Sequence, residues 1–185
     1  MSPGLRARRI QEEHKLLGRL QARNPGVFQC GPVRATDEGD EIEASLSETS
    51  AIVNLEGDPA AIQTAHTFRL RFPRFFPGVP LEAWLERPVF HPNIDPETGF
   101  VCLWTRTSVG DTAVEAVRRL HKILSLEMYN AEADHLMQPA ALAWLQDGAN
   151  AALAPLPRAH LACEPSHAAG APKTDGPRRR RLEPL

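Results

Sequence analysis

The sequence has few aromatic residues, few cysteines and no long apolar run. One tyrosine, three tryptophans and seven phenylalanines stand among 185 residues beside 17 prolines, which argues against an ordinary helical bundle. The three cysteines, at 30, 102 and 163, cannot all pair and form no CxxC unit, which argues against a disulfide scaffold and a thiol-rich zinc site. No apolar run approaches the ~20 residues that span a bilayer. The arginine-rich start has no apolar segment or cleavage site after it, so we expect a soluble, cytoplasmic protein without membrane contact.

Charge is distributed unevenly along the chain. Residues 1–23 carry a net charge of +4 and residues 173–185 one of +3, whereas the 149 residues between them carry −9. This acidic middle argues against nucleic acid as a partner. The basic run Arg178 to Arg181 is interpreted as part of a solvated tail, with nucleic acid or acidic membrane as the alternative ligands. Eighteen arginines against three lysines suggest a GC-rich bacterial coding sequence.

The chain length suits one domain followed by a tail. Past residue 156 the pattern dissolves into Pro, Ala, Gly and charge, which predicts a folded domain over 1–156 and a disordered tail over 157–185. Ser2-Pro3 is a favourable helix start, so we expect an amphipathic helix over roughly residues 3–23. Its apolar stripe is Leu5, Ile10, Leu16, Leu17 and Leu20.

Four segments with strand character follow this helix. Alternating or β-branched apolar residues mark them at 42–46, 51–55, 67–72 and 83–85. Residues 27–34 are either a further strand or a loop. Strands in meander order after one helix favour an antiparallel sheet of about four strands in an α+β fold.

Two further helices are expected in the second half of the chain. One begins at Asp111-Thr112 and the other at Pro139. The residues expected to face inward are Val114, Val117, Leu120 or His121, Leu124 and Met128 in the first helix, and Leu142, Leu145 and Ala149 in the second.

The segment 72–103 is rich in proline. Six prolines lie between 73 and 96, where they stiffen a loop and then an extended, sheetless approach to Cys102. A rigidly held thiol suits nucleophilic catalysis, which needs a donor for the oxyanion formed on acyl attack. Asn93, nine residues before Cys102, is the strongest donor candidate. The alternative for Cys102 is an inert buried thiol, as we expect for Cys30.

Three motifs stand in order within this segment. They are Phe72-Pro73-x-x-Phe76-Pro77-x-x-Pro80, His91-Pro92-Asn93-Ile94 and Gly99-x-x-Cys102-Leu103. Eleven positions separate Pro80 from His91, and eleven separate His91 from Cys102. With the order of the elements, these motifs and spacings resemble those of the ubiquitin-conjugating enzymes over about residues 3–153. The resemblance implies the fold of that family.

The resemblance also implies a carrier transferase. Cys102 would accept the C-terminus of a ubiquitin-like modifier from an activating enzyme as a thioester and pass it to an amine, such as a lysine of a target protein. Asn93 would stabilise the oxyanion or hold the loop near it. His91 and Pro92 would support the turn. Thioester exchange needs no metal and no organic cofactor.

Further residues take roles only by this resemblance. The family meets its activating enzyme on the first helix, so Arg6, Arg9 and Lys15 would contact that partner. Many members carry an acid beyond the second helix that helps to deprotonate the incoming lysine, and Glu132 and Asp134 lie in the corresponding loop without the family's local motif.

The sequence also departs from the family pattern. Trp104 stands in place of a common acidic residue, and Gly110-Asp111-Thr112-Ala113 replaces the usual Trp-Ser-Pro-Ala. These departures indicate a divergent bacterial member, from an operon with its own modifier, activating enzyme and peptidase. Such operons are associated with antiviral (phage) defence.

Two other functions stay open. A non-catalytic variant of the same fold would bind a ubiquitin-like protein, although such variants usually lack the cysteine that this chain keeps. An unrelated thiol hydrolase would pair Cys102 with a histidine. Such enzymes commonly place the thiol at a helix N-terminus, whereas residues 100–103 have an extended pattern. The histidines at 14, 66, 135, 160 and 167 show no metal-ligand spacing.

Overall fold

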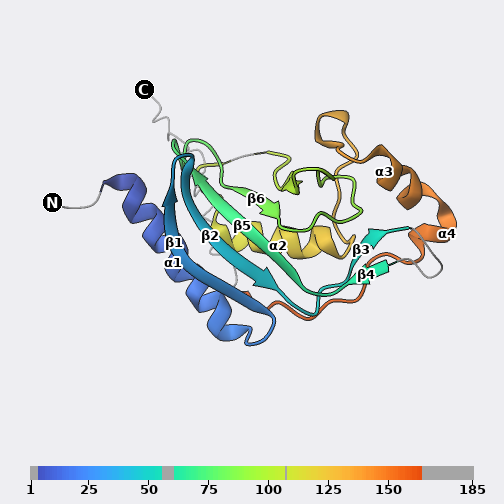
Figure 1. Ribbon diagram of the computed structural model, residues 1–185, viewed down its shortest axis with the longest axis horizontal. Helices are drawn as coiled ribbons and strands as arrows, with labels where there is room; N and C mark the ends of the chain where they lie inside the picture. Colours follow the sequence, from blue (N-terminus) through green and yellow to red (C-terminus); the bar gives the residue numbers. More distant parts are fainter. Residues whose placement is uncertain (1–3, 56–60, 107, 164–185) are drawn as a thin grey trace, which may run out of the picture.

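A five-stranded antiparallel sheet forms the centre of the molecule (Figure 1). The structure is a computed structural model that describes residues 4–55, 61–106 and 108–163. In spatial order the strands of the sheet are β1 (Phe28–Thr36), β2 (Gly39–Leu46), β5 (His66–Pro73), β6 (Glu82–Leu85) and β7 (Phe100–Val101). One apolar core joins this sheet to the first two helices. The α+β class that the sequence predicts is confirmed.

Alternation of apolar and polar residues located three of these strands. In β2 the side chains of Ile42, Ala44 and Leu46 are buried, because successive side chains of a strand point to opposite faces. The segments 67–72 and 83–85 lie within β5 and β6. The undecided segment 27–34 lies mostly in β1, which pairs with β2 and contains an irregularity between Cys30 and Val33.

The segment 51–55 is a strand, but its predicted place in the meander is wrong. β3 (Ala51–Asn54) pairs with β4 (Ala61–Gln63) in a separate two-stranded sheet. The reason lies in the neighbouring strands. β2 pairs with β5 along its whole length, from Gly39 opposite Pro73 to Leu46 opposite His66. The other edge of β2 pairs with β1 and that of β5 pairs with β6, so neither strand has an edge left for β3.

The approach to Cys102 is also less irregular than predicted. Residues 100–101 form β7, which pairs with β6 through Val101 opposite Ala83, so this part is not sheetless. Gly99 leads into the strand with φ of 75°, and a Cβ atom there would lie 2.2 Å from the Leu85 carbonyl oxygen. Only glycine meets both conditions. The last strand of the sheet therefore delivers the chain directly to Cys102.

The described helical segments are α1 (Leu5–Arg23), α2 (Ala113–Leu124), a 3₁₀ turn η1 (Ala133–His135), α3 (Pro139–Gln146) and α4 (Gly148–Ala151). On α1, Ile10, Leu17 and Leu20 are buried as predicted. Leu5 is 76% exposed, because the first turn of α1 extends past the edge of the sheet (Figure 1). The predicted start at Ser2-Pro3 lies outside the described residues.

The start of α2 is held by α1. Glu13, a buried residue of α1, accepts a hydrogen bond of 2.8 Å from the Ala113 backbone N–H, and Arg9 neutralises it at 2.7 Å. Thr112 caps the same helix by accepting from the Glu115 backbone N–H at 3.1 Å. A carboxylate at a helix N-terminus is favourable because backbone N–H groups there lack helical partners. The two helices are thereby fixed to each other.

The ends of the later helices differ from the prediction. Leu120 and His121 are both buried, but α2 ends at Leu124, so Met128 packs on the core from beyond the helix. The expected helix after Pro139 is interrupted at Asp147, whose side chain caps α4 at the Ala149 backbone N–H. Ala149 is therefore exposed rather than inward-facing.

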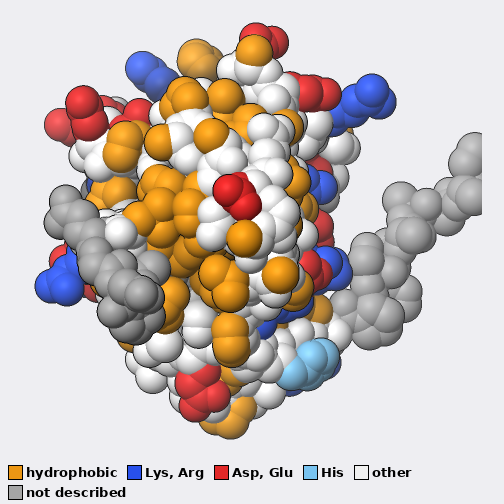
Figure 2. All heavy atoms as spheres, turned by 90° about the vertical axis from the view of Figure 1, so that its right-hand side faces the viewer, with side chains coloured by type: hydrophobic (Ala, Val, Ile, Leu, Met, Phe, Trp, Pro, Cys, Tyr) orange, Lys and Arg blue, Asp and Glu red, His pale blue; other side chains and the backbone are white. Residues whose placement is uncertain are grey.

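A second, smaller apolar cluster supports this end of the molecule. Ile52, Leu126 and Leu145 are its buried members, and the rings of Phe90 and Trp144 meet edge to face at 6.2 Å. Figure 2 shows apolar side chains gathered on this face, where α3, α4 and the β3–β4 sheet lie.

Residues 157–163, which the sequence assigns to the disordered tail, are packed in the structure. Arg158 forms an antiparallel bridge with Thr49, and Leu161 belongs to the main core. The backbone of Ala162 exchanges two hydrogen bonds, at 2.7 and 3.0 Å, with the buried Asn24 amide beyond the end of α1. This part of the predicted tail is therefore part of the domain, and residues 164–185 lie outside the described residues.

No described helix is long and apolar enough to cross a membrane.

Candidate active site

Cys102 is a half-buried thiol placed directly after β7. Its backbone N–H donates to the Asn93 carbonyl oxygen at 2.9 Å, and the preceding Val101 forms a bridge with Ile94. Burial raises the pKa of the Cys102 thiol, and a hydrogen bond from the Trp104 backbone N–H opposes this effect. The thiol is thus fixed in position and predominantly protonated near neutral pH.

Residues 91–94, which we call the HPN turn, are buried beside Cys102. The His91 ring accepts a hydrogen bond at Nδ1 from the Asn93 backbone N–H at 3.1 Å. Its Nε2 donates to the Met128 carbonyl oxygen at 3.2 Å. Burial lowers the pKa of His91 to about 3, so the ring stays neutral at physiological pH. His91 therefore holds the turn and does not exchange protons there.

The Asn93 side chain points to a second segment, residues 128–138, which we call the facing loop. Its Nδ2 donates to the carbonyl oxygens of Asn130 at 2.7 Å and His135 at 2.8 Å. Its Oδ1 accepts from the Asn130 backbone N–H at 2.6 Å. Both amide hydrogens are thus in use, so a bond to an oxyanion would have to replace one of them.

Further hydrogen bonds join the HPN turn to the facing loop. The Pro92 carbonyl oxygen accepts from the Met137 backbone N–H at 2.7 Å and from that of Gln138 at 3.2 Å. The Gln138 side chain donates to the Val89 and Ile94 carbonyl oxygens at 2.9 and 2.7 Å. Buried polar groups that are satisfied in this way specify one arrangement of the backbone.

The facing loop brings His135 to the thiol. Cys102 Sγ lies 2.9 Å from His135 Nδ1, and His135 Nε2 lies 3.7 Å from Glu132 Oε2. The His135 side chain is 21% exposed and that of Glu132 is 70% exposed. Sequence reasoning assigned no role to His135. The only available signal was its loop, which already contained the candidates Glu132 and Asp134.

The two acidic candidates differ in position. Glu132 lies near the His135 ring, whereas Asp134 is exposed and, among the described residues, no contact joins it to Cys102. Glu132 does not itself reach the sulfur, because His135 lies between them.

The segment after Cys102 is held by Trp104, the residue that replaces an acid common in the family that the sequence resembles. Its indole N–H donates to the Leu81 carbonyl oxygen at 2.8 Å, and the Arg119 guanidinium lies 5.0 Å from its ring centroid. In the proline-rich loop, Phe76 is buried against Phe72 at 5.0 Å between centroids. These contacts tie the segment after Cys102 to the loop after β5.

The basic residues of α1 are engaged to different degrees. Arg6 bonds to Asp40 and to the carbonyl oxygens of Phe72 and Pro73 at the end of β5. Arg9 holds Glu13, as described above. Lys15 is exposed and pairs with the exposed Glu12. Arg6 and Arg9 thus have structural contacts, and Lys15 is the one of these three that is mainly exposed to solvent.

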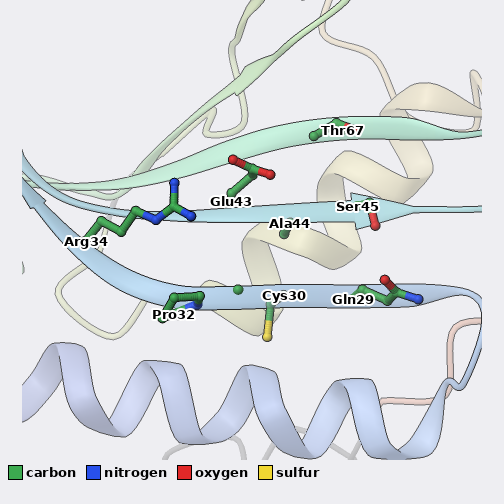
Figure 3. A pocket seen from close by; sticks show the side chains of 9 residues that line it. Gln29, Cys30, Pro32, Arg34, Glu43, Ala44, Ser45 and Thr67 are labelled. Atoms are coloured by element: carbon green, nitrogen blue, oxygen red, sulfur yellow. The ribbon is translucent and has the colours of Figure 1, made fainter.

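A pocket of about 310 Å³ lies on β1, β2 and β5, away from Cys102 (Figure 3). Its polar lining includes Arg34, Glu43 and Thr67. The Cys30 side chain points from β1 toward α1 and packs on the core, and burial raises its pKa. Cys163 also packs on the core, although the sequence placed it in the tail.

The arrangement of strands and helices is that of ubiquitin-conjugating enzymes. A Plasmodium yoelii protein assigned to these enzymes has a similar crystal structure, with a TM-score of 0.52 and 14% sequence identity over 80% of this chain and 88% of that one. Human ubiquitin-conjugating enzyme E2 G1 is also similar, with a TM-score of 0.47 and 17% identity over 66% of this chain and 98% of that one. No protein-family model and no curated protein sequence matches the chain. The chain has the ubiquitin-conjugating-enzyme fold, as its motifs predicted.

Proposed function

We propose that the chain is a conjugating enzyme that receives a ubiquitin-like protein from an activating enzyme and passes it to a lysine of a target protein. The observation that carries this proposal is the setting of Cys102. Its thiol is half-exposed, it follows β7 directly, and its backbone is held by Asn93 of the buried HPN turn. A fixed, accessible thiol on this fold is suited to carrying an acyl group as a thioester.

The first step is an exchange of thioesters. The Cys102 sulfur attacks the carbonyl carbon at the C-terminus of the modifier, a new C–S bond forms, and the thiol of the activating enzyme leaves with a proton. The reaction needs no redox partner and no cofactor, because one thioester replaces another. The raised pKa of Cys102 keeps the thiol protonated and unreactive toward stray electrophiles until the acyl donor arrives.

In the second step an acceptor amine attacks the Cys102 thioester, and the C–S bond breaks as the amide forms. The proton that the amine loses passes through solvent to the leaving Cys102 thiolate, so the products are the amide and the free thiol. We propose that Asn93 acts here by positioning, because its amide holds the carbonyl groups of Asn130 and His135. Of the two acidic residues, Glu132 acts through His135, and a role for Asp134 stays a prediction.

We place the docking of the activating enzyme on α1, with Lys15 as the exposed contact. Arg6 and Arg9 would support this docking surface indirectly. Arg6 attaches α1 to β5, and Arg9 pairs with Glu13, which attaches α1 to α2. The reversal Lys15→Glu should slow loading from the activating enzyme without changing discharge of a thioester already formed.

A loading experiment tests the central proposal. The full chain is mixed with ubiquitin whose C-terminus is a thioester of a small thiol, which removes the need for the cognate activating enzyme. We expect an adduct that reductant releases, and Cys102→Ser should give instead an ester that resists reductant. Cys30→Ser and Cys163→Ser are matched controls that should load normally. An adduct that persists in Cys102→Ala would disprove the assignment.

We further propose a bacterial origin and a place in a conjugation system linked to antiviral defence. Arginine outnumbers lysine by 18 to 3, as in proteins from GC-rich bacterial genomes. The test is genomic: adjacent genes should encode a ubiquitin-like protein and an activating enzyme. Neighbours unrelated to protein conjugation would count against it.

One observation favours a second candidate function, a thiol hydrolase. Cys102 contacts a histidine that in turn lies near a carboxylate, which is the pattern of thiol nucleophiles with a base. Against it, Cys102 follows a strand and not a helix N-terminus. Turnover of a small ester or peptide by the chain alone would favour the hydrolase. Binding of ubiquitin-like protein without any thioester would favour a non-catalytic binding module instead.

A further inference from the structure

The contact between Cys102 and His135 bears on the acceptors that the site can use. Cys102 Sγ lies 2.9 Å from His135 Nδ1, and Glu132 Oε2 lies 3.7 Å from Nε2 of the same ring. Of the two neutral tautomers of the ring, a carboxylate near Nε2 favours the one with its hydrogen on Nε2. Nδ1 is then a free lone pair that faces the sulfur.

We propose that His135 is the catalytic base of this site and that it allows Cys102 to transfer its acyl group to hydroxyl acceptors, such as serine and threonine side chains, in addition to amines. The inference rests on the proposed thioester function and concerns its second step.

Amines and hydroxyls make different demands on the site. A neutral amine attacks a thioester unaided and loses its extra proton after the C–N bond has formed. A hydroxyl must lose its proton while the C–O bond forms, because the protonated intermediate is too acidic to persist. That transfer requires a base within hydrogen-bond reach of the attacking oxygen. Imidazole accepts a proton near neutral pH far more readily than a carboxylate does.

The atoms and charges of the step balance without a further reactant. The acceptor hydroxyl gives its proton to His135 Nδ1 as its oxygen bonds to the thioester carbonyl carbon. The tetrahedral intermediate then breaks its C–S bond, and the Cys102 thiolate leaves. The proton returns from His135 to Cys102, which restores the thiol. The products are an oxygen ester of the acceptor and the free enzyme.

The surroundings of His135 keep the base in place while leaving it accessible. Its carbonyl oxygen accepts from the buried Asn93 side chain at 2.8 Å, which fixes the backbone of the residue. Its side chain is 21% exposed, so an acceptor can approach from solvent. The titratable neighbours are Cys102, Glu132 and the adjacent Asp134, while the buried His91 stays neutral.

The test compares transfer to a hydroxyl with transfer to an amine, starting from a Cys102 thioester that has been formed beforehand. Chain loaded with ubiquitin through the small-thiol thioester is freed of excess reagent and chased with Nα-acetyl-threonine amide or with Nα-acetyl-lysine. The first compound offers only a hydroxyl and the second only its ε-amine as a strong nucleophile. Mass spectrometry measures the rate of each product. We expect wild type to form both, and the threonine ester to resist reductant but not mild alkali.

The variant His135→Ala should lose about 100-fold or more in the rate of ester formation and less than about tenfold in that of amide formation, as the loss of a general base predicts. Added imidazole should restore part of the ester rate, which a purely structural role of His135 would not allow. His160→Ala, which removes an exposed histidine that lines a different pocket, should match wild type.

The failures are distinguishable. A loaded wild type that forms the lysine amide but no threonine ester overturns the hydroxyl inference and leaves the thioester function standing. Equal losses for both acceptors in His135→Ala, without imidazole rescue, also overturn it. If no adduct forms on Cys102 at all, the proposed function fails and the inference fails with it.

Discussion

The HPN turn contacts the backbone of Cys102 and the facing loop contacts its thiol, and the two segments differ in burial and in their ionisable groups. His91, Pro92, Asn93 and Ile94 are buried, and the one ionisable side chain among them is kept neutral. The facing loop carries His135 and the exposed Glu132 at the surface. The difference teaches that one side holds the geometry of the site, while the other carries the groups for which we propose a role in proton transfer. A site needs both, because a base is effective only at a fixed distance from its target.

The largest effect should come from breaking the link between the two regions. Asn93→Ala removes three hydrogen bonds and leaves the Asn130 and His135 carbonyl groups without this partner. We expect a loss of about 3–4 kcal/mol in the free energy of unfolding, since each unsatisfied buried group costs about 1–3 kcal/mol. Urea unfolding measures it. The variant Asn130→Ala, which keeps the backbone groups that Asn93 binds, is the control and should lose much less.

Lowering the pH should destabilise the HPN turn through the buried His91. Burial lowers its pKa to about 3, whereas an unfolded histidine titrates near 6.5, so below about pH 6.5 the unfolded state binds a proton that the folded state refuses. Its contribution is intact above about pH 6.5 and falls by about 1.4 kcal/mol per pH unit below it. Between about pH 6.5 and pH 4, wild type should lose roughly 3 kcal/mol more than His91→Asn.

Urea unfolding at a series of pH values tests this difference in slope. His66 and His121, whose pKa values burial also lowers, are present in both proteins and cancel in the comparison. Parallel curves for wild type and His91→Asn would contradict a neutral, buried His91.

A milder change in the hydrogen bonds around the HPN turn is Gln138→Ala. It removes two side-chain hydrogen bonds to the Val89 and Ile94 carbonyl oxygens but keeps the Asn93 contacts. We expect a loss of about 1–2 kcal/mol in the free energy of unfolding. Loading of Cys102 should fall by less than in Asn93→Ala, as measured by the rate of adduct formation. A loss of stability in Gln138→Ala as large as that in Asn93→Ala would contradict this order, because it would mean that both side chains stabilise the HPN turn equally.

The smallest effect on stability should come from the exposed side. Glu132→Gln changes a side chain that is 70% exposed, so the free energy of unfolding should shift by less than about 0.5 kcal/mol. Its effect should instead be visible in the rate of ester formation, which should fall once no carboxylate lies beside Nε2 of His135. An unchanged rate would show that Glu132 does not position the His135 ring. Asp134→Asn removes the other carboxylate of the loop and should lower the rate by less than Glu132→Gln does.

The periodicity of apolar residues was enough to locate much of the fold, and the motif spacing was enough to locate the HPN turn and Cys102. Alternation located β2, β5 and β6, and helical spacing located α1 and α2, because neighbouring residues carry these periods. It located β3 but not its partner β4, because the sheet that β3 joins was decided by the pairing of β2 and β5 with other strands. It also failed for residues 157–163, whose irregular sequence is ordered by contacts with Asn24 and Thr49.

The sequence by itself determined the position of Cys102, the proline-rich approach to it and the HPN turn eleven residues before it. These features lie within one short stretch, where spacing along the chain is close to spacing in the structure. Only the tertiary structure decided that the Asn93 side chain hydrogen-bonds to the facing loop and that His135 contacts the thiol. Those contacts join residues 42 and 33 positions apart, and no local rule relates their side chains. Hydrogen bonding between two separate loops, and not sequence spacing, sets the distance from the His135 ring to the Cys102 sulfur.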